Sequence, residues 1–250
     1  MTQFMANLKN ELFKLRKRKK YYVFLILGTI LCVASGLRLA LANYVLGTGV
    51  SRAAVMGGLV ADNQMFYLMI FLPLMAIMAS CDLFVSEAGD HTIRFSLMRP
   101  VSKEKLFFSK SAAVWVLCVF DLAVLFIATS LTQLILGGTA EGILVTFISC
   151  VFDLIPLAVL ILFFCLVNQW GRSAGLSVLL CIVLYVGLWA LGTYQPSLGG
   201  LLFTGYIRWH NLWVGVTLPF LSLLPRIGLL AGYGLVFGCC GFMLFDRKEA

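Results

Sequence analysis

Charge and histidine are scarce in this chain. Only 12% of its 250 residues are charged, and its two histidines are His91 and His210. No polar stretch is long enough to build a soluble domain beside the apolar segments. The eight cysteines include no Cys-x-x-Cys pair, so they indicate small apolar side chains and carry no zinc or redox motif.

Two motifs that would point to catalysis or nucleotide binding are absent. The sequence has no His-Glu-x-x-His and no Gly-x-x-x-x-Gly-Lys-Ser/Thr phosphate loop. Without that loop the chain is not expected to bind ATP in the usual way. The two histidines are expected on opposite sides of a membrane, so they are not expected to share a metal. We expect no enzymatic activity of its own and no cofactor bound by this chain.

Apolar residues dominate instead. They make up 61% of the chain, against roughly 45–50% in soluble domains. Runs of about 20 residues or more, enough to cross a hydrocarbon core, indicate an integral membrane protein. We expect one all-α transmembrane domain over residues 1–250, with six spans at about 21–46, 64–85, 106–136, 143–168, 173–195 and 222–245.

The positions of Lys and Arg predict the orientation. Fifteen of the nineteen basic residues fall on the side of the two termini if six spans are present. Cytoplasmic flanks are enriched in Lys and Arg, so both termini are expected in the cytoplasm. The net charge of +8 is therefore attributed to membrane flanks and not to nucleic acid binding.

Residues 2–20 form a basic segment with apolar residues at helical spacing. Phe4, Leu8, Leu12 and Leu15 fall on one face, which predicts a helix in the inner membrane interface. A cleaved signal peptide is the alternative for this start. Its removal would leave five spans, so an uncleaved first span is favoured.

The segment 196–221 is apolar and aromatic but broken by glycines. Tyr206, Trp209, His210 and Trp213 would share a face if this segment were helical. We expect either an aromatic anchor at the outer interface or a re-entrant hairpin before the last span.

Two carboxylates lie inside apolar spans. Asp121 and Asp153 are each at least ten residues from either end of their spans. Such groups are costly in a bilayer and normally face protein or water. They are candidates for a translocation path, where they would attract a cation or carry a proton. The structural alternative is that they are neutral or hydrogen-bonded to neighbouring Ser, Thr, Tyr or Trp side chains.

The most charged stretch between two spans is residues 82–110. Asp90 can cap a short helix in which Ile93 and Leu97 share a face, and Pro100 ends it. A small amphipathic helix between two spans is suited to docking a cytosolic partner.

At this stretch the chain resembles permease subunits of type-2 ATP-binding cassette (ABC) exporters. That family shows an acidic residue after the second span, a Thr-Ile-like helix, an Arg-Pro-Val-Ser element and a Lys opening the third span. The chain departs from the pattern at His91, where Gly is usual, and at Lys103, where Arg is common. The matching residues are Glu87, Thr92-Ile93-Arg94, Arg99-Pro100-Val101-Ser102 and Lys110.

The resemblance implies a permease that exports a substrate such as a peptide antibiotic, a drug or a lipid. Two copies of a separate ABC ATPase would bind ATP and Mg, and a second permease, identical or related, would complete the complex among the lipids of the cell membrane. Apart from the resemblance, we expect Glu87 and Asp82, which lie nearer the membrane, to fix the loop against basic neighbours such as Lys105 or Lys110. The residues implied to couple the ATPase are Glu87, Asp90, Ile93, Arg94, Phe95, Leu97, Met98 and Arg99.

Two other functions stay open at this point. An ion-coupled secondary transporter would use Asp121 and Asp153, although no inverted repeat is evident. A membrane anchor or assembly factor that transports nothing would not need buried carboxylates.

Overall fold

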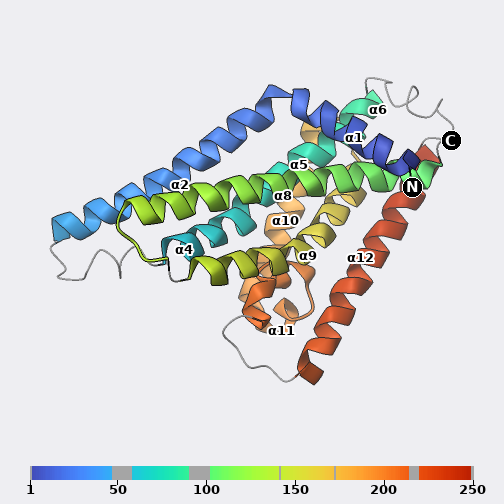
Figure 1. Ribbon diagram of the computed structural model, residues 1–250. Coiled ribbons are helices and arrows are strands. Elements are labelled where there is room, and N and C mark those ends of the chain that lie inside the picture. The colour runs from blue at the N-terminus through green and yellow to red at the C-terminus, as the bar shows by residue number, and fades with distance from the viewer. Residues whose placement is uncertain are drawn as a thin grey trace.

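The computed structural model describes residues 2–46, 58–89, 102–140, 142–171, 173–213 and 220–248 (Figure 1). These residues form helices and turns, without strands. Six helices are long and apolar enough to cross a membrane, which confirms the predicted all-α membrane fold. They are Lys19–Val45, Leu59–Ser86, Lys103–Ile135, Ile143–Asn168, Ala174–Tyr194 and Leu223–Arg247.

Helix α1 (Thr2–Lys17) precedes the first span, α2 (Lys19–Leu46), and the helix is interrupted at Arg18. The leucines of α1 face the protein, and Leu15 is completely buried, as the apolar spacing predicts. Because α1 packs along α8 (Lys103–Ile135), it is tied to the bundle. Figure 1 shows both chain termini at the same end of the molecule, which we name the basic end.

The second span is the centre of the bundle and is longer than predicted. It consists of α4 (Leu59–Phe66), the π-helical turn η1 (Tyr67–Phe71), α5 (Leu72–Cys81) and a second π-helical turn, η2 (Asp82–Ser86). The short α6 (Glu87–Gly89) continues it. Side chains of α5 fill the core and contact α8, α9 and α10.

The remaining spans surround this centre. They are α9 (Ile143–Asn168), α10 (Ala174–Tyr194) and α12 (Phe220–Lys248). Figure 1 shows α2 and α12 on opposite flanks of the molecule. Both carry exposed apolar side chains, such as Leu41 and Leu235, as expected of helices that meet lipid or another membrane subunit.

The segment between the fifth and sixth spans does not form one helix, so the predicted aromatic face was wrong. Up to residue 213, where the description stops, it contains α11 (Pro196–Gly199) and two 3₁₀ turns, η3 (Phe203–Tyr206) and η4 (Trp209–Leu212). Tyr206 and Trp209 are buried, with ring centroids 5.7 Å apart. The segment packs on α9 and α10 inside the bundle, which favours the re-entrant alternative over an anchor at the surface.

Candidate functional site

A buried cation joins the second and third spans at the basic end. Lys110, in the second turn of α8, has no exposed side-chain surface. Its Nζ donates to Glu87 Oε2 at 2.6 Å and to the carbonyl oxygen of Leu83 at 3.0 Å. Leu83 lies in the π-helical turn η2. A charge without water needs such partners, so Lys110 fixes α8 to the end of the second span.

Helix α1 completes this cluster. Glu11 Oε2 lies 3.5 Å from Lys110 Nζ, while Lys14 Nζ lies 2.8 Å from Glu11 Oε1 and 3.0 Å from Glu87 Oε1. Burial alone would lower the pKa of Lys14, but its hydrogen bonds and charge attraction to Glu11 and Glu87 outweigh burial and raise it. We name Glu11, Lys14, Glu87 and Lys110 the inner ion cluster.

Asp82 forms a second set of contacts at the same end. One carboxylate oxygen lies 2.7 Å from both Arg18 and Lys20, and the other accepts a hydrogen bond from the Tyr21 hydroxyl. Arg18 is the residue at which α1 and α2 are interrupted. Asp82 therefore holds the corner between the N-terminal helix and the first span.

The predicted coupling residues are only partly within the described residues. Glu87 is described and pairs with Lys110, which confirms that expected contact. Asp82 pairs with the N-terminal segment and not with Lys105 or Lys110, so that expectation was wrong. The other coupling residues lie outside the described residues: Asp90, Ile93, Arg94, Phe95, Leu97, Met98 and Arg99.

Away from the basic end, Asp153 of α9 is held by three donors inside the bundle. Gln64 Nε2 and His210 Nδ1 lie 2.9 and 2.6 Å from its Oδ2, and the His210 backbone N–H donates to its Oδ1 at 2.8 Å. The carboxylate is buried. Polar neighbours were expected as one alternative, but His210 and Gln64 were not foreseen as those neighbours.

Asp121 lies on α8 with its side chain buried. Its Oδ2 has no hydrogen-bond partner among the residues that the structure describes. A buried polar oxygen without a partner is costly, so this position departs from ordinary packing. Whether Asp121 lies on a translocation path stays a prediction.

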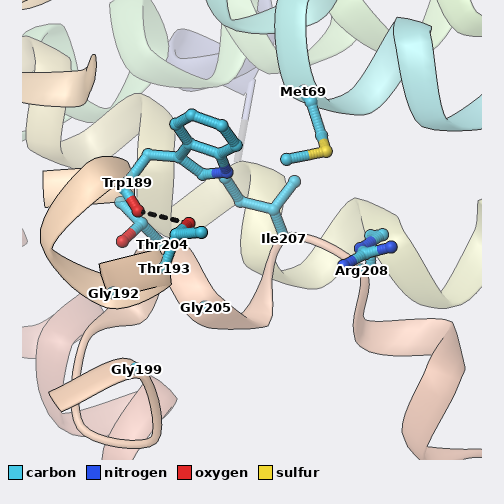
Figure 2. A pocket seen from close by; sticks show the side chains of 9 residues that line it. All are labelled: Met69, Trp189, Gly192, Thr193, Gly199, Thr204, Gly205, Ile207 and Arg208. Atoms are coloured by element: carbon cyan, nitrogen blue, oxygen red, sulfur yellow. Dashed lines mark hydrogen bonds between the residues drawn. The ribbon is translucent and has the colours of Figure 1, made fainter. Parts of the chain in front are cut away.

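Two adjoining cavities lie near the re-entrant segment, and Met69 and Trp189 line both. The first, of about 310 Å³, is also lined by Thr193, Thr204 and Arg208 together with the backbone of several glycines. Figure 2 shows the side chains of Met69, Trp189 and Ile207 gathered on one side, with the Thr193 hydroxyl donating to the Trp189 carbonyl. This cavity offers hydroxyls, a cation and apolar surface together.

The second cavity, of about 470 Å³, lies between the second and fifth spans. Besides Met69 and Trp189, it is lined by apolar side chains and by Asp62. The Tyr185 hydroxyl in its wall donates to the Met69 carbonyl oxygen at 2.8 Å. Met69 lies in the π-helical turn η1, so each π-helical turn has a carbonyl bound by a side chain of a neighbouring span.

One sequence pattern needs the structure for its interpretation. Gly171-Arg172-Ser173-Ala174-Gly175 has the letters of a nucleophile elbow, which requires a strand before its helix. Here Gly171 follows α9, Ala174 and Gly175 already lie in α10, and the Ser173 hydroxyl accepts from the Leu176 backbone N–H at 3.4 Å as a helix cap. No group of three or more potential metal ligands occurs within the described part of the chain.

Comparison with known proteins places the chain in a family. No curated protein matches it. The family described as ABC-2 family transporter protein matches residues 7–187. That range runs from α1 into α10 and contains the inner ion cluster and Asp153. Because the match covers most of the sequence, the chain belongs to the ABC-2 transporter family.

Proposed function

We propose that this chain is the permease subunit of an ABC exporter and couples ATP hydrolysis on a separate subunit to movement of a substrate. Membership of the ABC-2 family supports the membrane permease of an ABC transporter and its association with an ABC ATPase. The exporter direction, the cell membrane and the cytoplasmic termini come from the sequence arguments.

The inner ion cluster carries the proposal. Stretch 90–101, which holds the predicted coupling helix, follows α6 and precedes α8. Glu87 stands at its start and Lys110 shortly after its end, and the two side chains are bonded at 2.6 Å. Glu11 and Lys14 bind the same pair from α1. A displacement of this stretch by a bound ATPase would therefore be transmitted through the buried ion pairs to α1, α6 and α8.

The second span offers a route from that cluster to the cavities. Residues of α5 such as Met75 and Ala76 have no exposed surface, so this helix is enclosed by its neighbours. At one end η2 contacts Lys110, and at the other η1 supplies Met69 to both cavities. Movement of the second span would thus change the cavity walls. Because π-helical turns interrupt the regular helix, they are natural places for such a change.

The lining of the two cavities supports the proposal that the substrate is amphipathic. Their walls combine Met69 and Trp189 with one acidic and one basic side chain, Asp62 and Arg208. Apolar surface with a few polar groups is the usual make-up of a small-molecule site. Peptide antibiotics, drugs and lipids all fit this description, and we propose that one of these classes is the cargo.

The complex would contain two copies of the ATPase and a second permease, identical or related. ATP and Mg would bind to the ATPase alone. The exposed apolar flanks of α2 and α12 would meet lipid or the second permease.

Co-purification with a candidate ATPase tests the docking. Changing Ile93 and Leu97 together to Asp replaces two apolar contacts worth about 3 kcal/mol by area. We expect the ATPase to be lost while the permease still inserts in the membrane. As a control, Ser197→Asp with Leu198→Asp adds the same charge at exposed positions on α11. Wild-type recovery of the ATPase with the Ile93/Leu97 variant, with transport intact, would refute the proposal.

Transport in vesicles separates the other functions. An exporter needs ATP and its ATPase, whereas a secondary transporter would move cargo under an ion gradient without ATP. An anchor or assembly factor would move no cargo in either condition.

A further inference from the structure

Asp153 makes a contact that reaches deep into the bundle. It is the eleventh residue of α9, which begins at Ile143, so it lies about 15 Å along the helix at 1.5 Å per residue. His210 belongs to the re-entrant segment and nevertheless meets it at 2.6 Å. At this contact the segment therefore enters the bundle to about mid-span.

Both oxygens of the Asp153 carboxylate take part in this contact. One oxygen accepts from His210 Nδ1 and Gln64 Nε2, and the other accepts from the His210 backbone. Hydrogen bonds to an ionised acceptor are roughly twice as strong as neutral ones. The carboxylate is fully enclosed, whereas 19% of the His210 side chain is exposed. In this bond, therefore, the Asp153 side chain is enclosed by protein, whereas the His210 side chain is partly accessible from outside.

The same segment forms one wall of the first cavity. Thr204, Ile207 and Arg208 line that cavity from the segment, and Met69 lines it from the second span. Two residues beyond Arg208 the chain is fixed to α9 by His210. At its other end the segment is held by close backbone packing, because a Cβ on Gly199 would lie 2.6 Å from the Gly192 carbonyl oxygen. The polar bond at His210 therefore fastens one end of this wall, together with the Trp213 ring, which stacks on Phe152 of α9 with centroids 5.5 Å apart.

We propose that Asp153 and His210 form a latch that keeps residues 196–213 closed over the cavity at Met69 and Trp189. When the bond breaks, the η4 end of the segment can leave α9, while the glycine packing holds the α11 end. The cavity then opens toward the end of the bundle opposite the inner ion cluster. That cargo crosses this opening rests on the proposed function; the latch itself does not.

Thiol accessibility tests the latch in the purified permease without any ATPase. Met69→Cys places a reporter in the cavity wall, and the exposed Cys239 and Cys240 are changed to Ala. A charged maleimide is added from solution. We expect His210→Leu to raise the labelling rate at position 69 by about tenfold or more, since it removes a charge-assisted hydrogen bond.

Two controls separate a latch from general loosening. His210→Asn keeps an N–H donor near the position of Nδ1 and should restore labelling to within about threefold of the parent rate. A second reporter, Tyr44→Cys, lies in another cavity, between α2 and the end of α8, and should label at the same rate in all variants. Gln64→Leu removes only the third donor and should give an intermediate rate at position 69.

The outcomes are decisive in each case. Equal labelling of Met69→Cys in His210→Leu and parent protein, failure of His210→Asn to restore it, or a parallel rise at Tyr44→Cys would overturn the latch. Should His210→Leu not fold, Gln64→Leu with the same reporter takes its place, and an unchanged rate then overturns it. Failure of ATP-driven transport with the labelling pattern as expected would count against the proposed function alone.

Discussion

Lys110 Nζ lies 2.6 Å from Glu87 Oε2, and the side chains of both residues are almost completely shielded from water. Glu87 directly follows the second span and Lys110 is the eighth residue of the third, so the two spans cannot separate here without exposing a charge or leaving it without a partner. Glu11 brings a second carboxylate to the same ammonium group. The inner ion cluster is therefore a fixed joint between the N-terminal helix and the two spans that flank stretch 90–101.

Removing the cation of this joint should be strongly destabilising. In Lys110→Met, Glu11 and Glu87 keep their charges, and Lys14 is the cation that remains in the inner ion cluster. Breaking a buried ion pair by removing one partner costs about 3–5 kcal/mol. We expect a large fall in melting temperature in detergent. The matched control is Lys103→Met, whose pair with Asp246 is partly exposed and should contribute about 0–1 kcal/mol.

The double variant Lys110→Met with Glu87→Gln completes this prediction. It removes both charges of the shortest pair, so part of the lost stability should return. A melting temperature for Lys110→Met equal to that of Lys103→Met would show that the cluster is not the joint described.

The pH dependence of the cluster has a definite direction. Because Glu11 and Glu87 raise the pKa of Lys14 above its ordinary value of 10.5, the stabilisation from Lys14 is fully present below that pH. It is lost as pH rises through the higher pKa of the folded protein. Arg stays protonated throughout this range. Lys14→Arg should therefore match the parent at pH 8 and exceed its melting temperature above about pH 10.5.

A parallel measurement isolates this lysine from other groups that titrate at high pH. Only the difference between parent and Lys14→Arg is compared, so tyrosines and other lysines cancel. A constant difference from pH 8 to 11.5 would contradict the assignment.

Close packing of the first and second spans gives a third prediction. A Cβ on Gly28 would lie 2.5 Å from Cε2 of Phe71, whose ring stacks on Phe24 with centroids 4.3 Å apart. Since the ring is pinned from the other side, Gly28→Ala should cost about 1–3 kcal/mol. Gly187→Ala is the control, because nothing lies within 4 Å of its added Cβ. Equal melting temperatures of the two variants would argue against this packing.

The sequence predicted the fold because each span carries its own signal. A run of apolar residues is a local property, and so is the excess of basic residues at its flanks. The pairing of Glu87 with Lys110 also followed, since both stand beside one loop. The contact of Glu11 with Lys110 could not be predicted in this way, because it depends on how α1 packs on α8.

The contacts of Asp153 could not be read from the sequence for a related reason. Asp153 and His210 are 57 positions apart, and no periodicity links them. Asp153 was identified as a buried carboxylate because an acidic residue inside an apolar run can be recognised from its sequence neighbours alone. Its partner depends on a segment that folds into 3₁₀ turns and enters the bundle, whereas the aromatic spacing indicated a helix. No sequence pattern predicted the π-helical turns of the second span either.

Orientation in the membrane is the last prediction, and cysteine labelling measures it directly. In a cysteine-free background, Thr48→Cys and Ser197→Cys should react with an impermeant reagent in intact cells, whereas Ser102→Cys should react only after permeabilisation. The reason is that fifteen of the nineteen basic residues flank the spans on the side of Ser102, and such flanks stay in the cytoplasm. Thr48 lies in stretch 47–57, outside the described residues, and Ser197 lies in α11. Labelling at position 102 in intact cells, with positions 48 and 197 protected, would show that the orientation is the opposite of the predicted one. It would then put the inner ion cluster on the wrong side to meet a cytosolic ATPase.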